Sequence, residues 1–416
     1  MKTKADYDWC AHPGVLENVK TGQSFPNSNP LAEGLRRLLA AGDESICIEG
    51  TDAVSSVQTK CYMPDVGIGE DSNNGKEVSL AGVTWPKELI IGGLDEGSAL
   101  GGVFLTQRSG VPGPLRFESL KAFARGVSMY CIESGQKFPK PYGGVTAVDV
   151  ECLAFDPTVL GDKPAKFGFR LDCHDYVRLE GITGFGFQDY LAYCDNSQED
   201  SWIRKSMATN CGRGLCQWSN REFTDPENTE RTNNPSTPET ATLTLQNNLA
   251  IDCSSYVDPD DGSIHANGSA FAVQDFCGDV NLLGNTVLQT RAGGGGCFIG
   301  HDAKAGSFKR ADGFRIGIVR AQRNQFIGVA GAHASRDMEM FGAMKRLELG
   351  PNQFGGNLPC VLLDHTGKIG EVVALIPNLS AKRYWGTGAK IRRVVQGTSK
   401  TVTLSDQQID ALYVLA

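Results

Sequence analysis

The chain lacks long hydrophobic runs. Among its 416 residues, no window approaches the ~18 uninterrupted apolar residues that a membrane-spanning helix needs. Residues 1–26 contain Lys2 and Lys4 but no apolar segment of the kind found in secretory signals. We therefore expect no membrane partner and a protein that is made and folded in a cytoplasm. The alternative is a secreted enzyme that has lost its signal.

An excess of basic residues is also missing. The 40 Lys and Arg residues are outnumbered by 48 Asp and Glu residues, and the formal net charge is −8. The only modest basic cluster lies at residues 382–393, where a solvated surface explains it. Nucleic-acid-binding domains need a concentrated basic patch, so the sequence predicts no nucleic-acid partner.

Close cysteine pairs are absent although cysteine itself is not. The 13 cysteines are scattered between Cys10 and Cys360, and no second pair or histidine accompanies Cys211 and Cys216 at zinc-finger spacing. Many lie inside apolar runs, as Cys47 does between two isoleucines. Such cysteines behave as small buried hydrophobic residues. The sequence therefore predicts reduced core thiols, no metal site and no cofactor.

Glycine and short strand-like runs are abundant. The chain contains 50 glycines, well above the average usage of roughly 7 %. One amphipathic helix is predicted, beginning at Asn29-Pro30, with an apolar stripe at Leu31, Leu35, Leu38 and Leu39 and an end at Gly42. Short strands are predicted at residues 45–49, 60–63, 78–83, 89–91, 103–106 and 127–132. This pattern indicates an all-β protein in which a short N-terminal helix caps the first rung.

An irregular repeat begins at Phe167. Five apolar runs start at Tyr176, Trp202, Leu243, Val280 and Phe314. Each is followed by a second apolar piece, at residues 185–191, 215–218, 270–276, 297–299 and 326–330, and polar inserts at 220–240 and 254–268 take up the extra length. The helical crossovers of a doubly wound sheet are absent between these runs, and the tight hairpin turns of a sandwich are few. The pattern therefore predicts an elongated parallel solenoid.

The strand, Gly-rich turn, strand arrangement of residues 176–193 and the corners at Asn210-Cys211 and Asp252-Cys253 carry a family resemblance. With these features, residues 167 to about 375 resemble the pectate-lyase-like superfamily, over roughly half of the chain and without an intact family motif. The resemblance implies a single right-handed parallel β-helix and a polysaccharide as ligand or substrate. The superfamily includes polysaccharide lyases, hydrolases, epimerases and phage spikes that recognise host glycans.

Three regions are expected. Residues 1–30 form an N-terminal segment that could serve for attachment, residues 31–376 form the β-helix, and residues 377–416 form a small C-terminal cap or extension. Two further strands are predicted in that last region, at residues 391–395 and 401–404.

One column of candidate catalytic residues follows from superposing the second apolar pieces. The superposition aligns Asp189, Gln217, Asp275 and His301, and Asp302 is adjacent. Strands stand about 4.8 Å apart, so Asp275 and His301 would lie within ~5 Å and Asp189 roughly 10 Å from Asp275. The second distance is near the upper limit of about 9.5 Å for the carboxylates of inverting glycosidases. Asp189 and Asp275 are thus candidate acid and base, with His301 tuning one of them. Alternatively, strict alternation of side chains along the strands points these residues into the core, or they lie at corners and stabilise turns.

Candidate sugar-binding residues are aromatic and basic. Tyr190, Tyr193, Trp202 and Trp218 offer flat surfaces suited to sugar rings, although core packing is an equally simple role. Arg204 belongs to a set of basic residues near the first strands that a lyase would use to hold an acidic sugar, or that form a solvated face. The acidic stretch at 195–200 could bind a cation or supply a carboxylate, and the stretch at 258–262 resembles a calcium loop, but polar turns explain both.

Two functional hypotheses remain. In the first, the chain is a virion spike-like protein that recognises a host surface polysaccharide, with or without depolymerising it. Such a protein would be a homotrimer attached to the virion through residues 1–30. In the second, it is a free polysaccharide lyase or glycoside hydrolase of the same superfamily.

Overall fold

The structure is a computed structural model. It describes residues 2–27, 30–50, 62–63, 66–68, 77–78, 84–101, 103–105, 113–123, 130–134, 143–155, 164–220, 236–253, 256–257, 264–265, 268–290, 295–300, 310–328, 337–341, 344–350, 352–353, 361–364, 371–374, 384–385, 394–396 and 400–402.

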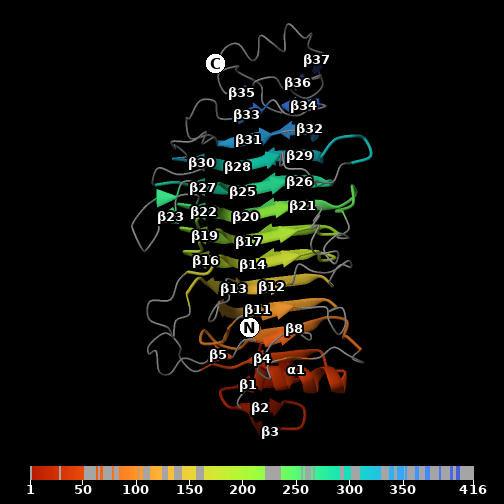
Figure 1. Ribbon diagram of the computed structural model, residues 1–416, viewed down its shortest axis with the longest axis vertical. Helices are drawn as coiled ribbons and strands as arrows, with labels where there is room; N and C mark the ends of the chain where they lie inside the picture. The colour runs from red at the N-terminus through yellow and green to blue at the C-terminus, as the bar shows by residue number, and fades with distance from the viewer. Residues whose placement is uncertain are drawn as a thin grey trace, which may run out of the picture.

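Parallel strands stacked one above another make up most of the molecule (Figure 1). One complete rung consists of β15 (Val177–Glu180), β16 (Thr183–Phe185) and β17 (Tyr190–Asp195). The next consists of β18 (Ser201–Arg204), β19 (Met207–Thr209) and β20 (Gly214–Ser219). Each strand pairs in parallel with its counterpart in the next rung. The chain is therefore all-β with parallel sheets, consistent with the predicted solenoid.

The strands form three stacks. The first stack contains β4 (Ser45–Ile48), β8 (Leu89–Gly93), β11 (Leu115–Phe123), β13 (Val145–Leu153), β15, β18, β21 (Thr242–Gln246), β26 (Asp279–Leu283), β29 (Ile316–Gln322), β32 (Met344–Leu349), β34 (Glu371–Ala374) and β36 (Val394–Gln396). The second contains β5 (Tyr62–Met63), β9 (Ala99–Gly101), the C-terminal parts of β11 and β13, β16, β19, β22 (Leu249–Ile251), β27 (Thr286–Leu288) and β30 (Gln325–Ile327). The third contains β7 (Glu77–Val78), β6 (Val66–Ile68), β10 (Val103–Leu105), β12 (Tyr130–Ser134), β14 (Phe167–Asp172), β17, β20, β25 (Ser269–Gln274), β28 (Gly295–Gly300), β31 (Met338–Phe341), β33 (Val361–Asp364) and β35 (Tyr384–Trp385).

The strand sequences alternate between core and surface. In β18, Ile203 is fully buried while Trp202 and Arg204 on the opposite face are partly exposed. The inward positions of successive rungs are partners in register, as Ile203 and Leu245 are, and they belong to one continuous hydrophobic core. Period-two alternation thus places the core inside the stack.

A buried asparagine ladder connects four rungs between the first and second stacks. Asn248, Asn285 and Asn324 each donate a side-chain hydrogen bond of 3.0 Å to the amide oxygen of the asparagine in the next rung, and Asn352 ends the ladder. Each of the first three also donates to a backbone carbonyl. The amides therefore satisfy the backbone at a corner where strand pairing is interrupted.

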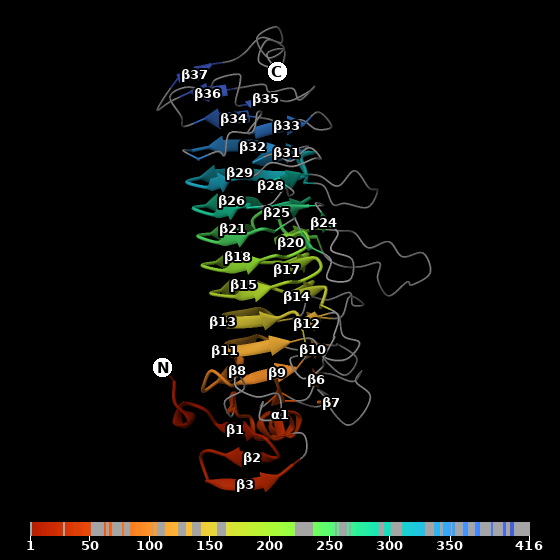
Figure 2. The ribbon, with the colours of Figure 1, turned by 90° about the vertical axis from the view of Figure 1, so that its left-hand side faces the viewer.

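The N-terminal end is closed by a helix and an antiparallel meander. Strands β1 (Trp9–His12), β2 (Val15–Asn18) and β3 (Gln23–Pro26) pair antiparallel, and β1 also pairs in parallel with β4. A 3₁₀ turn, η1 (Lys4–Asp6), precedes them. Helix α1 (Pro30–Ala41) buries the predicted leucine stripe against this end of the stack (Figures 1 and 2). The predicted helix is confirmed, and β1–β3 extend the stack.

Two smaller pairs complete the described strands. In the predicted insert at 254–268, β23 (Tyr256–Val257) and β24 (Ile264–His265) pair antiparallel. Near the C-terminus, β37 (Lys400–Val402) pairs antiparallel with β36, so the two strands predicted in the tail are confirmed within a few residues.

The predicted composition of a rung is wrong. The sequence predicts two strands per rung, whereas the rungs described above have three. The extra division arises because a single residue in left-handed conformation separates the first two stacks. Lys205, with φ of 51°, is such a residue. As a result, residues 215–218, 270–276 and 297–299 contribute to the third stack, residues 326–330 to the second, and residues 185–191 span parts of both.

Candidate functional site

Two aligned carboxylates lie on the outer face of the third stack. Asp172 ends β14 and Asp195 ends β17, and the two residues are partners in register. The preceding residues, Leu171 and Cys194, belong to the hydrophobic core, so alternation places both aspartates on the opposite face. Adjacent strands are about 4.8 Å apart, which brings the two carboxylates into neighbouring positions.

Polar residues continue this arrangement in the next rungs. Ser219 pairs in register with Asp195, and Gln274 pairs with Ser219. The Ser219 hydroxyl donates a hydrogen bond to Asp195 Oδ1. We call Asp172, Asp195, Ser219 and Gln274 the polar column. Asp172 and Asp195 are each only 1 % exposed, and burying a carboxylate is expensive unless an opposite charge or a hydrogen bond compensates it.

An arginine and a tyrosine flank the carboxylates. Arg170 and Tyr193 are partners in register two residues before Asp172 and Asp195. The Arg170 guanidinium lies 5.6 Å from the centre of the Tyr193 ring, and its Nε is 3.4 Å from Asp172 Oδ2. Phe167 contacts the same ring, with 5.1 Å between ring centres. The face thus combines negative charge, one cation and an aromatic surface.

Chain neighbours of the two aspartates, Cys194 and His174, are deeply buried. Burial, followed by the nearby Cys216, Asp195 and Asp172, raises the pKa of the Cys194 thiol. Two residues after Asp172, burial lowers the pKa of His174 to about 4, although a contact of 2.8 Å between its Nδ1 and the Gly143 carbonyl opposes this effect. His174 is therefore neutral at physiological pH.

The predicted ladder of Asp189 and Asp275 is wrong. Asp189 directly precedes β17, whereas Asp275 directly follows β25, so the two lie at opposite ends of third-stack strands. Six-residue strands put them roughly 20 Å apart along the strand direction. Gln217 pairs with Ala272, so it does not align with Asp275 either. The superposition is wrong because the apolar residues that it aligns lie at opposite ends of their strands.

The neighbours of Asp189 and Asp275 are those of residues that stabilise the fold. Asp189 is 8 % exposed, with Arg213 Nε at 2.9 Å and Lys166 Nζ at 3.4 Å. Asp275 is fully buried at a corner with φ of 52°, and its amide donates to the Gly300 carbonyl. Arg315 Nη1 is 4.0 Å from its carboxylate. These features agree with the alternative prediction, in which the two residues stabilise turns.

Gln274 pairs with Gly300, the residues directly before Asp275 and His301 in the sequence. His301 and Asp302 themselves lie outside the described residues.

The candidate sugar-binding residues are distributed over three environments. Trp218 is fully buried in the core and donates to Ser197 Oγ at 3.2 Å, so it offers no surface platform. Tyr190 and Tyr193 belong to the third stack beside the polar column, with Tyr190 only 4 % exposed. Trp202 and Arg204 face outward from the first stack. The structure therefore does not bring the five predicted residues into one site.

On the first stack, Trp202 stacks with two arginines. The guanidinium carbons of Arg178 and Arg204 lie 4.6 Å and 4.5 Å from the Trp202 ring centre, and that of Arg178 also lies 3.9 Å from the Tyr176 ring centre. Cation–π contacts of this kind form a partly exposed surface of aromatic and basic character.

A small acidic depression lies near the corner between the first and second stacks. Its volume is about 140 Å³, and its lining includes Asp95, Asp149, Glu151 and Lys121. That volume is below the ~300 Å³ of ordinary ligand pockets, and the acidic lining does not favour an acidic sugar.

The sequence did not indicate Asp172 and Arg170, and it indicated Asp195 only within an acidic stretch that could bind a cation or supply a carboxylate. A signal was present. The six-residue strands β14 and β17 have the sequences FGFRLD and YLAYCD, each ending in aspartate. Aligning strands by their last residue would have found the pair.

Comparisons with known proteins give little further information. No family model matches the chain, and no curated protein matches it. A solved structure with a similar arrangement is the tailspike protein gp49 from Acinetobacter baumannii bacteriophage Fri1, a capsular polysaccharide depolymerase. The identity is 11 % and the TM-score 0.33, over 76 % of this chain and 57 % of that chain, so this chain spans little more than half of the tailspike. In the described parts of the chain, no helix has the length and apolar character needed to cross a membrane.

Proposed function

We propose that this chain is a single right-handed parallel β-helix that recognises and cleaves a polysaccharide as a virion spike-like protein. Right-handedness is expected because about 98 % of crossovers between parallel strands have that hand. The observation that carries the functional proposal is the pair of aligned carboxylates, Asp172 and Asp195, beside Arg170 and Tyr193. The tailspike described above belongs to the same functional class, but the proposal does not depend on that similarity.

The two carboxylates suit glycoside hydrolysis. Retaining glycosidases place their carboxyl groups about 5–5.5 Å apart, close to the spacing of ~4.8 Å between adjacent strands. Arg170 balances the charge of Asp172, which makes Asp172 the nucleophile. Asp195, hydrogen-bonded by Ser219, is then the general acid that protonates the leaving oxygen. Tyr193 offers an aromatic surface to a sugar ring.

Activity on a panel of bacterial capsular and other acidic polysaccharides tests this proposal. New reducing ends would indicate hydrolysis, whereas ultraviolet absorbance from unsaturated products would indicate a lyase. Asp172→Asn and Asp195→Asn should each lower kcat by about 10²–10⁴-fold without abolishing glycan binding. Glu151→Gln, on the exposed surface of β13, is the matched control and should retain activity. Unchanged rates in both aspartate variants would contradict the assignment.

The Trp202 surface supports a second, non-catalytic binding role. Trp202 and Arg204 face outward on a stack other than that of the carboxylates, so they could hold a second segment of a long acidic glycan. Trp202→Ala should weaken glycan retention in an affinity gel while kcat on short oligosaccharides stays unchanged. A parallel fall in kcat on those oligosaccharides would place Trp202 in the cleavage site instead.

A homotrimer is part of the proposal. An apolar column runs along the outer face of the second stack through Leu153, Phe185, Thr209, Ile251, Leu288 and Ile327, which are partners in register. Phe185 is 59 % exposed and Ile327 is 40 % exposed. Contiguous apolar surface of this kind is typical of interfaces. Three copies around one axis would cover it, while the segment 1–30, whose strands β1–β3 lie at one end of the stack (Figure 2), would serve for attachment to the virion.

The alternative is a free hydrolase or lyase. Light scattering on the purified chain distinguishes the two, because a stable monomer would contradict the spike assembly and leave the free enzyme.

A further inference from the structure

Four metal-ligand side chains share one face of two adjacent strands at the N-terminal end. Cys10 and Cys47 are partners in register between β1 and β4. His12 follows Cys10 by two positions and Glu49 follows Cys47 by two positions, and the Glu49 amide donates to the Ala11 carbonyl. Because side chains alternate along strands, Cys10, His12, Cys47 and Glu49 form a square on one face.

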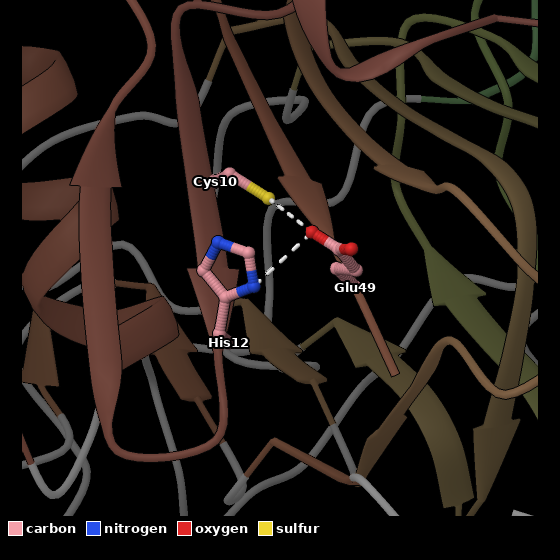
Figure 3. A group of neighbouring side chains, drawn as sticks. All are labelled: Cys10, His12 and Glu49. Atoms are coloured by element: carbon pink, nitrogen blue, oxygen red, sulfur yellow. Dashed lines mark hydrogen bonds and ion pairs between the residues drawn. The ribbon is translucent and has the colours of Figure 1, made fainter. Parts of the chain in front are cut away.

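The side-chain atoms converge, as Figure 3 shows for Cys10, His12 and Glu49. His12 Nδ1 lies 3.1 Å and Cys10 Sγ lies 3.9 Å from Glu49 Oε2. One ligand atom from each of these three residues lies within 4.8 Å of the others. A tetrahedral zinc ion, with bond lengths of about 2.0–2.3 Å, holds its ligand atoms roughly 3.3–3.8 Å apart. Small side-chain rotations are therefore enough to close the three residues around an ion.

A second carboxylate orients the histidine. His12 Nε2 is 3.4 Å from Glu17 Oε2 on β2, and the same oxygen is 2.5 Å from Lys4 Nζ. Metal-bound histidines usually donate their other ring N–H to a carboxylate, which fixes the ring and its tautomer. In this chain that contact directs Nδ1 towards Glu49 and Cys10. A simple surface ion pair does not require this arrangement.

We propose that Cys10, Cys47, His12 and Glu49 bind one zinc-type divalent cation. The donor set of two thiolates, one imidazole and one carboxylate matches the preference of zinc for sulfur and nitrogen ligands. Both cysteines are fully buried, as thiolates in structural zinc sites commonly are. Cys10, His12 and Glu49 have ligand atoms within 4.8 Å of one another, and Cys47, the register partner of Cys10, would be the fourth ligand that closes the site and makes the ion structural. The ion connects the N-terminal meander to the first rung of the stack.

The hydrogen bond with Cys47, followed by burial, raises the pKa of the Cys10 thiol, and the hydrogen bond with Cys10 raises the pKa of His12. The charged groups that face the site from the packed elements are Lys4, Glu17 and Glu49.

Metal analysis of the untagged full chain tests the proposal. After equilibration with zinc and gel filtration, the wild-type chain should retain one zinc ion per chain. With cobalt in place of zinc, it should show a thiolate-to-cobalt charge-transfer band. Cys10→Ser and His12→Gln should lose both signals, and the Cys10→Ser/His12→Gln double variant sets the background. Cys277→Ala, which removes a buried thiol from a different rung, should retain both signals.

Glu17→Gln keeps all four ligands and tests the orienting contact. It should weaken zinc binding by about 10–100-fold in a competition titration with a chromogenic chelator, with one ion still bound at saturation. A chelator should also lower the Tm of the wild-type chain but not that of the double variant. The proposal is wrong if wild-type zinc retention equals that of the double variant, or if cobalt gives no thiolate band. The cobalt band is measured on the wild-type chain alone, so it decides the question even where a variant fails to fold.

Discussion

At the residue scale, the buried aspartates differ in the groups that neighbour their carboxylates. Asp189 is held by two cations at the start of a strand, whereas Asp172 and Asp195 stand side by side with Arg170 beside one of them. Burial alone does not distinguish these aspartates, since all three are less than a tenth exposed. The arrangement of their neighbours does, because Asp172 and Asp195 are adjacent carboxylates, as the proposed hydrolysis requires, whereas Asp189 lies between Lys166 and Arg213.

His174 should make stability depend on pH. Its pKa is about 4 in the folded chain and 6.5 in its ordinary state, so the unfolded chain binds the extra proton. Its contribution is fully present above pH 6.5 and is lost as the pH falls towards 4. At 1.36 kcal/mol per pH unit, the loss amounts to about 3 kcal/mol.

The measurement compares Tm between pH 7 and pH 4.5 for the wild-type chain and His174→Gln. The variant should lose less Tm over this interval, although it starts lower because the contact with the Gly143 carbonyl is altered. Parallel pH profiles for the two proteins would show that another group causes the dependence.

At the element scale, the corners between stacks hold the rungs in position. A left-handed residue turns the chain between the first and second stacks, and the asparagine ladder satisfies the backbone beside it. The sequence predicted the capping helix correctly, because its cap, leucine stripe and terminal glycine all lie within a few residues of one another. It did not predict the corners between the first and second stacks, since a turn made by a single residue is a short signal within an otherwise strand-like run.

Asn285→Ala should destabilise the stack more than a change at the end of the ladder. Asn285 donates to the Leu245 carbonyl and to Asn324, and it accepts from the backbone and the side chain of Asn248. Its loss leaves buried groups without partners, at a cost of about 3 kcal/mol.

Asn352→Ala is the matched control, because Asn352 ends the ladder and is partly exposed; its cost should be about 1 kcal/mol. Urea denaturation of both variants measures the difference. Equal costs would mean that the ladder does not act cooperatively.

At the scale of the whole molecule, each of the three stacks has its own outer face, and a different ligand could bind to each face. The third stack carries the carboxylate pair, the first carries Trp202 with its arginines, and the second carries the apolar column. Separate stacks allow one chain to bind a glycan on some faces and its own copies on another.

The double variant Phe185→Glu/Ile327→Glu should convert the proposed trimer into monomers, because charged residues cannot be buried unpaired at an apolar interface. Light scattering coupled to gel filtration measures the mass. Thr146→Glu, on the outer face of the first stack, is the control and should leave the mass unchanged. A trimer that survives the double variant would place the interface elsewhere.

The sequence by itself determined the class of fold and the position of the cap. Alternation, frequent glycines and the absence of helical crossovers are local properties, and they are enough to indicate stacked parallel strands. Tertiary structure decided the register. Which residues meet across rungs depends on hydrogen bonds between segments separated by inserts of unequal length, and a shift of one residue reverses the face of every side chain. For that reason the predicted column of Asp189 and Asp275 is wrong. The register instead pairs Asp172 with Asp195 and Cys10 with Cys47.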